Sequence, residues 1–438
     1  MTASEAKAYY LTQPSAPGPE WARPVRQKAL ERFAALGFPT THDEDWKYTS
    51  VEPLVKIPFA AGSGGDDGAE RRIADFGVED LTPNRLVAVD GRFSNRLARL
   101  GDLPKGVIAC GLAQAMSAHR NLVEPYWTRI ADYREQAFSA LNTARAEDGI
   151  FLFVPAGVTL APIQLLFISS AAEDGPTVSH PRCLVVLGRG SQATVVESYF
   201  GMRDEAYWTN AVTEIVLDDN AVFDGYKIQM ESERGFHIAT QEARLGRDAV
   251  FTSHSFALGA ELARNDVNAA FVGEGGDCTL NGLYVTAGFQ HVDNHTRIDH
   301  KQPRCTSREL YKGIMGGKSR GVFNGKIYVH AHAEKTDARQ TNRNLLLSEE
   351  AWVDTKPQLE IHNNDVKCSH GSTIGQLDDD AVFFLRSRGL DLHAAIGLLT
   401  QGFANDITGR VKQAPVAEVM ERKLSEKIDL MAQEKERW

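Results

Sequence analysis

Cysteine is scarce in this 438-residue sequence, and no two of its five cysteines form a CxxC pair. This spacing argues against a zinc ribbon and a disulfide framework, so we expect reduced thiols. The N-terminal stretch MTASEAKAYYLTQPSAPGPEW has neither a basic region nor an apolar region of the kind that directs secretion. Both absences favour a cytoplasmic protein. The cysteines are Cys110, Cys183, Cys278, Cys305 and Cys368.

Positive charge and long apolar runs are also lacking. The formal net charge is −10, which disfavours nucleic acid as a partner because phosphate binding depends on Lys and Arg clusters. One apolar stretch, Ile150 to Ser169, is interrupted by Pro155, Gly157, Pro162 and Gln164. It therefore predicts two short buried strands, IFLFVP and IQLLFIS, rather than a membrane span.

Common catalytic motifs are missing as well. The sequence contains no HExxH and no GxSxG, and KGIMGGKS (312–319) differs from a phosphate loop because Lys312 replaces its first glycine and a strand-like segment follows. The acidic residues form no pattern that indicates acid–base catalysis. We therefore expect a protein without turnover of its own.

The N-terminal third, residues 1–149, is interpreted as a mostly helical, mixed domain. Residues 24–37 have helical periodicity with Gly37 as the C-cap, and AGSGGDDG (61–68) is typical of a loop. A second helix is predicted from Pro125 to Arg145.

Residues 150–378 consist of short β-rich runs separated by Gly, Asp and Asn. A weak repeat places a small residue at Ala193, Ala221, Ala249, Cys278 and Cys305, with intervals of 28, 28, 29 and 27 residues. A period in this range is typical of solenoids and is too short for propeller blades. We predict a right-handed parallel β-helix, with an irregular β-sandwich as the alternative.

Residues 379–438 are predicted to be helical, with breaks at Gly389 and new starts at Asp391 and Pro415. Apolar residues line one face of the last helix. That face either packs onto the solenoid or docks another protein, and composition does not decide between the two. Its members are Val416, Val419, Met420, Leu424, Ile428 and Met431.

The segment DVKCSHG (365–371) is the strongest candidate for chemistry. If it is extended, Cys368 and His370 face the same side, and a thiolate with an imidazole suits iron, zinc or an iron–sulfur cluster. Two ligands do not complete a tetrahedral site, so the others would come from elsewhere, including a partner chain. The alternative is a packed cysteine beside a hydrogen-bonded histidine. His330 and His332 are interpreted as structural or interface residues.

Several segments resemble one protein family. The run from Gly321 to Leu390, with HTRIDHKQPRCTSRELYKGIM (295–315), FVPAGVTLAPIQLLF (153–167) and GFPTTHDEDWKYTS (37–50), is similar to the SufB/SufD family. The forms GFPTTHDEDWKYT and KCSHGST are those of the SufD branch. Arg343 stands where the SufB branch carries a cysteine implicated in cluster assembly.

The resemblance implies a non-catalytic subunit of the SUF iron–sulfur cluster assembly complex. It implies pairing with SufB through the β-helix, docking of the ABC-type ATPase SufC on the C-terminal helices, and a role in iron acquisition. It favours His370 over Cys368 as the residue that lies at the interface with SufB. No cofactor is expected to be bound stably by the chain alone, although iron or a cluster would be held transiently at the interface with SufB. Flavin is associated with such complexes, but we place no flavin site.

Two alternatives remain. The chain could be the sister scaffold SufB, or a polysaccharide-acting β-helix enzyme, which would want a secretion signal and an acidic metal site. Whether the isolated chain forms a homodimer stays open.

Overall fold

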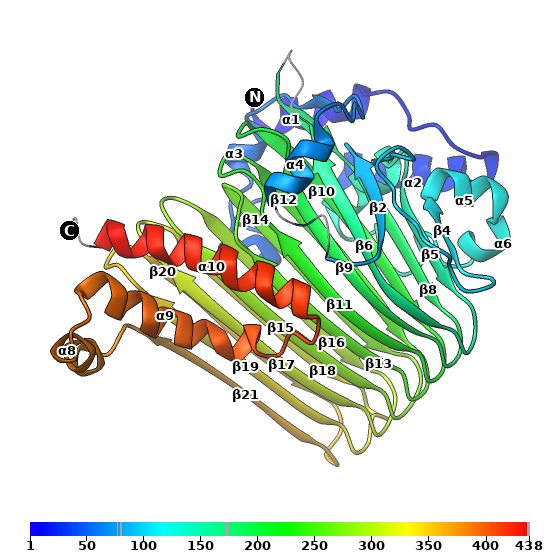
Figure 1. The fold of residues 1–438 in the computed structure, drawn as a ribbon. Helices are drawn as coiled ribbons and strands as arrows, with labels where there is room; N and C mark the ends of the chain where they lie inside the picture. Colours follow the sequence, from blue (N-terminus) through cyan, green and yellow to red (C-terminus); the bar gives the residue numbers. More distant parts are fainter. Residues whose placement is uncertain (77, 79–80, 171–174, 436–438) are drawn as a thin grey trace.

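Most strands of the computed structural model belong to two long parallel sheets that together form a solenoid (Figure 1). The structure describes residues 1–76, 78, 81–170 and 175–435. Along the chain from β8 onward, successive strands alternate between the sheets, so each rung of the solenoid contributes one strand to each sheet. The predicted parallel β-helix is confirmed.

The sheets are named here A and B. Sheet A contains β4 (Ile108–Gly111), β5 (Gly149–Val154), β8 (Arg182–Leu187), β10 (Tyr207–Leu217), β12 (Phe236–Leu245), β14 (Leu262–Phe271), β16 (His291–His300), β18 (Arg320–Val329) and β20 (Trp352–Ile361), with β1 (Ala60–Ala61) and β7 (Thr177–Ser179) at its side. Sheet B contains β3 (Arg92–Phe93), β2 (Asn84–Val89), β6 (Thr159–Ser169), β9 (Gln192–Gly201), β11 (Val222–Gln229), β13 (Val250–Ala257), β15 (Asp277–Thr286), β17 (Thr306–Met315), β19 (Asp337–Leu346) and β21 (Lys367–Gly375).

Alternation along each strand sends every second side chain into the space between the sheets. This interior is mostly apolar and continuous from rung to rung. The predicted small residues are all buried, but they occupy two different positions. Ala193 lies within its strand and pairs with Phe223, whereas Ala221 and Ala249 directly precede theirs. The predicted repeat length is therefore correct. The prediction that these small residues occupy equivalent positions is wrong, because the turns between strands differ in length.

The two strands predicted between residues 150 and 169 are β5 and β6, joined by a turn that contains Pro155 and Gly157. The first predicted helix is α2 (Arg23–Leu36), which ends at Gly37 with a positive φ of 69°. The remaining helical segments before the solenoid are α1 (Ala3–Thr12), α3 (Glu52–Val55), α4 (Ala69–Phe76), α5 (Leu112–Ala118), α6 (Arg120–Val123) and α7 (Ala137–Arg145), with short 3₁₀ turns at Glu20–Ala22 and Glu44–Trp46.

The helix predicted from Pro125 to Arg145 is wrong in its first half, since only α7 forms. The backbone N–H groups of Thr128, Ile130 and Ala131 all donate to the carboxylate of Glu214 on β10, at 3.0–3.1 Å. Glu214 is fully buried beside Arg182. The backbone N–H groups that would donate within a helix thus donate to a buried carboxylate instead.

Most helices of the N-terminal segment cover the outer face of sheet A, whereas α4 packs on the side of sheet B. α1, α2, α3 and α7 pack around Trp208, Phe236 and Leu262, which point outward from β10, β12 and β14. β3 and β4 pair antiparallel with their neighbours and close one end of the solenoid.

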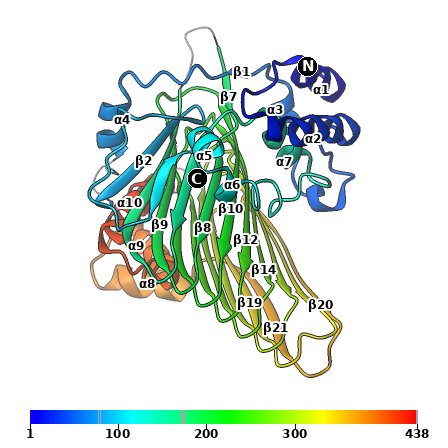
Figure 2. The same cartoon turned by 90° about the vertical axis from the view of Figure 1, so that its right-hand side faces the viewer.

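The C-terminal helices α8 (Asp379–Ser387), α9 (Leu392–Thr408) and α10 (Ala414–Lys435) lie on the opposite side of the solenoid, over sheet B (Figure 2). Asp391 caps α9 as predicted, accepting from the N–H of Ala394 at 2.7 Å. The six apolar residues predicted to line the last helix are all buried, in one cluster with outward-facing residues of sheet B. This face of α10 therefore packs onto the solenoid. Residues 436–438 of the predicted helix lie outside the described residues. None of the described helices is long and apolar enough to span a membrane.

Candidate functional site

The solenoid ends at β20 and β21, and this end is open. In the described structure β20 pairs only with β18 and β21 only with β19, so each presents one free strand edge. Large apolar side chains are exposed here, with Trp352 62% and Ile374 51% accessible. A free edge with apolar neighbours is a surface that readily pairs with another chain.

The predicted pair Cys368 and His370 lies on β21, at this open end. The register aligns Cys368 with Ala338 and His370 with Gln340, and both of these β19 residues are buried between the sheets. Cys368 and His370 therefore face the same side, toward the solenoid interior, as alternation in an extended strand requires. Cys368 is half-buried beside Ala338, Ile327 and Val329, and burial raises the pKa of its thiol. His370 is exposed.

These two side chains do not complete a metal site within the described part of the chain. No group of three or more His, Cys, Asp or Glu residues that could hold a metal ion occurs among the residues that the structure describes. A thiol and an imidazole in this position could supply two ligands to iron or a cluster whose other ligands came from a second molecule.

His330 and His332 are not strand neighbours, because β18 ends at Val329 and both residues lie in the turn that follows. The ring of His330 packs 4.5 Å from that of Tyr328, and burial lowers the pKa of His330. His332 is exposed.

Arg343 points away from the interior, toward the C-terminal helices. The carboxylate of Asp406 on α9 forms ion pairs with Arg343 at 3.8 Å and with Lys312 of β17 at 2.7 Å. The Lys312 ammonium also lies 3.8 Å from the centre of the Phe403 ring. These contacts fasten α9 to the outer face of sheet B.

Part of the C-terminal helical unit remains uncovered. Phe383 and Phe384 of α8 are 73% and 55% exposed. A groove of about 440 Å³ runs between α9 and α10, lined by residues that include His393, Leu398 and Asp429. Exposed aromatic side chains and open grooves between helices are both typical of protein-interaction surfaces.

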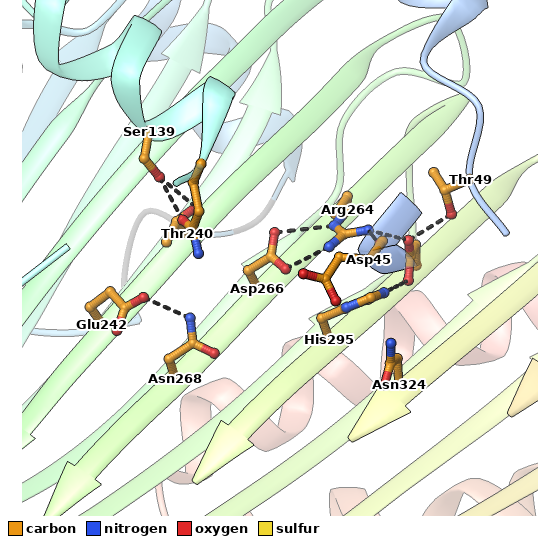
Figure 3. Close-up of polar contacts among 12 residues, drawn as sticks. Asp45, Thr49, Ser139, Thr240, Glu242, Arg264, Asp266, Asn268, His295 and Asn324 are labelled. Atoms are coloured by element: carbon orange, nitrogen blue, oxygen red, sulfur yellow. Dashed lines mark hydrogen bonds and ion pairs between the residues drawn. The ribbon is translucent and has the colours of Figure 1, made fainter. Parts of the chain in front are cut away.

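The segment after α2 is held on the outer face of sheet A by a polar cluster (Figure 3). Arg264 of β14 donates to the backbone oxygen of Asp45 at 2.6 Å and to the carboxylate of Asp293 at 2.9 Å, and Thr49 donates to the same carboxylate at 2.6 Å. Burial opposes ionisation of Asp293, but His295 and Arg264 hold its pKa below the ordinary value. The family-like segment 37–50 thus has a clear structural role.

A second group of polar residues, inside the solenoid, was not identified from the sequence. Glu197, Lys227, Glu231 and His237 are all buried between the sheets. They escaped notice because charged residues that alternate with apolar ones look like the exposed side of a strand. Only the register shows that their side chains point inward.

Comparison with known proteins gives the class and then the family. The fold is that of a parallel β-helix protein with helical appendages. Residues 17–165 match the family model described as the SufBD protein N-terminal region, and residues 167–403 match that of the SufBD core domain of SUF-system iron–sulfur cluster assembly. The chain belongs to the SufBD family of iron–sulfur cluster assembly proteins.

Curated relatives agree. The chain is 35% identical over 408 residues to a SufBD family protein of Synechocystis, covering 91% of this chain and 88% of the relative. It is 33% identical over 387 residues to the iron–sulfur cluster assembly protein SufD of Escherichia coli, covering 88% of each. A third relative, the chloroplastic protein ABCI7 of Arabidopsis thaliana, is 29% identical over 395 residues, covering 87% of this chain and 81% of the relative. The resemblance to SufD is confirmed.

Proposed function

We propose that this chain is a non-catalytic subunit of a SUF iron–sulfur cluster assembly complex. It pairs with a SufB-like subunit through the open end of the solenoid and holds a SufC-like ABC-type ATPase through its C-terminal helices. The observation that supports this best is the coincidence of free strand edges on β20 and β21 with the half-complete Cys368 and His370 pair.

Cluster chemistry at this end follows from the donor types. Iron is the substrate, and thiolate and imidazole are suitable ligands for it. His370 is accessible, whereas Cys368 is half-buried, so His370 is placed first as the interfacial ligand and Cys368 second. Iron or a cluster is held transiently between the two subunits, and no cofactor is bound stably by this chain alone.

The ATPase is assigned to α8 and to the groove between α9 and α10. The buried face of α10 is already used against sheet B, so the exposed aromatic pair Phe383 and Phe384 provides the free apolar surface. Five unpaired cysteines support a cytosolic location, four of them buried.

Two substitutions separate the proposed contacts. The full chain is tagged, purified gently from its own cells, and its companions are identified by mass spectrometry. Phe383→Asp should lose the ATPase and keep the SufB-like subunit, because it places a charge on the exposed face of α8. Ile374→Asp should lose the SufB-like subunit, because it places a charge at the open end.

Phe289→Asp is the matched control, since Phe289 is 80% exposed on the turn between β15 and β16 and lies neither on the terminal strands nor in the lining of the groove between α9 and α10. It should retain both companions. Recovery of the unsubstituted chain without either companion would refute the proposal.

A further inference from the structure

Charged and polar side chains form a nearly continuous file through the interior of the solenoid. It begins at Glu231, which lies just after β11. The Glu231 carboxylate accepts hydrogen bonds from Thr209 at 2.7 Å and from Gln229 at 2.9 Å, and it lies 2.9 Å from Nδ1 of His237. All four residues are buried. An interior of this kind is costly unless each polar group has a partner, because desolvation is not otherwise offset.

The file continues toward β21 one rung at a time. Lys227, beside this group, donates to Asn265 of β14 at 2.6 Å. Asn265 aligns with Asn294 of β16 in the neighbouring rung. Adjacent strands lie about 4.8 Å apart, so their side chains are within reach of each other or of a bridging water.

The last part reaches the candidate site. Thr296, two residues after Asn294 and on the same side of β16, donates to Glu309 of β17 at 2.5 Å. Glu309 also accepts from Gln340 of β19 at 2.7 Å, and Gln340 aligns with His370. Polar side chains therefore occupy every position of this file from Glu231 to Gln340, which lies beside His370.

Several atoms along this file lack a protein partner. Among the described residues, Nε2 of His237, Nδ2 of Asn265, Nδ2 of Asn294 and Oε1 of Gln340 are buried with no hydrogen-bond partner. Each is destabilising if it is left unsatisfied, because its desolvation is then not offset. Four such atoms spread over successive rungs are best accounted for by bound water, which typically bridges buried polar groups of this type.

The file starts beside a surface pocket, although the Glu231 side chain itself is only 1% exposed. Glu231 also lines a surface pocket of about 950 Å³ between the solenoid turns and α10, where Lys427 donates to Gln290 at 2.7 Å. The file thus extends from the wall of this pocket to the candidate cluster site at the open end.

We infer that this file is a hydrated proton route that connects the open end of the solenoid with solvent at the pocket beneath α10. The inference rests on the proposed function, since a subunit paired over the open end shuts that site off from bulk water. Binding of iron by thiol and similar ligands releases protons, which must leave the closed interface. Protons pass along the waters and side chains to the pocket, and no electron moves. Burial raises the pKa of Glu309 to about 7, so this carboxyl can both accept and release a proton near neutral pH.

The first test asks whether the interior is wet, and it uses the full chain alone. Hydroxyl radicals from a millisecond X-ray pulse modify side chains beside bound water, and mass spectrometry locates the modification. Tyr199 and Tyr284 point into the interior and should be modified although both are 1% exposed. Tyr226 is the control, because it is equally buried but points outward into the apolar cluster under the C-terminal helices.

The second test blocks the file. Asn294→Leu replaces the amide by an apolar group of similar size, and Ile298→Leu changes an inward apolar residue on the same strand. Asn294→Leu should slow cluster formation in the reconstituted complex by about tenfold or more, since positioned proton transfer contributes about 10²–10⁴-fold to reaction rates. Ile298→Leu should leave that rate unchanged. Asn265→Leu blocks the preceding rung and serves if the first variant does not fold.

The outcomes separate the two proposals. Interior tyrosines as unreactive as Tyr226 would show a dry interior and overturn the route, whatever the complex does. An unchanged rate of cluster formation with Asn294→Leu would also overturn it while leaving the assembly function intact.

Discussion

His370 is an exposed imidazole on the last strand of the solenoid, beside a half-buried thiol. Replacing it by alanine should lower the iron and acid-labile sulfide content of the purified complex without dispersing the subunits, because one exposed side chain contributes little to a large interface. Iron, sulfide and subunit ratios are measured on the same sample. His362→Ala, at an exposed position beyond β20, should leave all three unchanged. Equal cluster content in both variants would remove His370 from the site.

Glu309 links one residue to the pH dependence of folding. Burial raises its pKa from 4.5 to about 7 in the folded chain. The stability that the protonated form provides is fully present below pH 4.5 and is lost as the pH rises through 7, because the folded state then binds more protons than the unfolded state. Glu309→Gln removes this titration.

Urea unfolding at pH 5 and pH 8 tests this expectation. The free energy of unfolding of Glu309→Gln, relative to that of the unsubstituted chain, should rise by about 2–3 kcal/mol between the two pH values. Other titrating groups cancel in the comparison. A difference that does not change with pH would mean that Glu309 is ionised in the folded protein.

At the scale of elements, two glutamates in register on the outer face of sheet A have different roles. Glu214 of β10 pairs with Arg182 at 2.7 Å and holds the turn at 128–131. Glu242 of β12 aligns with it but hydrogen-bonds only to Asn268, among the contacts described for it, and burial with nearby carboxylates raises its pKa to about 8.

Glu214→Gln should therefore lower the free energy of unfolding by about 3–5 kcal/mol, because it leaves the Arg182 charge buried without its partner. Glu242→Gln, at the neighbouring register position, should cause no loss at pH 8. Both are measured by urea unfolding. Similar losses in the two variants would show that the ion pair is not what holds the turn.

The same contrast explains what the sequence could predict. The start of α9 at Asp391 and the apolar face of α10 depend on residues within a few positions, so local patterns revealed them. The turn at 128–131 depends on Glu214, which is more than 80 residues away in the sequence. The local helical pattern therefore predicted a helix that does not form there. Alternation predicted that Cys368 and His370 share a side. It did not reveal that their strand ends the solenoid, or that Glu231 and His237 lie inside it.

For the whole molecule, the two ends of the solenoid differ. At the first end β2 and β5 pair with the antiparallel strands β3 and β4, whereas at the other end β20 and β21 pair with no further strand of the described residues. The described part of the C-terminal helices lies along the side of the solenoid, where α9 contacts β15 and β17. Apolar residues and unpaired backbone groups at one end of a rod favour association with a surface of the same kind.

In the absence of a SufB-like subunit, the open end should therefore associate with a second copy of itself. The full chain alone is expected to sediment as a dimer at micromolar concentration, and Ile374→Asp as a monomer, since the substitution desolvates a charge at the contact. Phe289→Asp should remain dimeric, because Phe289 lies on a turn between β15 and β16, away from that end. A dimer that persists in Ile374→Asp would place self-association on another surface, and a monomeric unsubstituted chain would mean that these edges need the shape of a different partner.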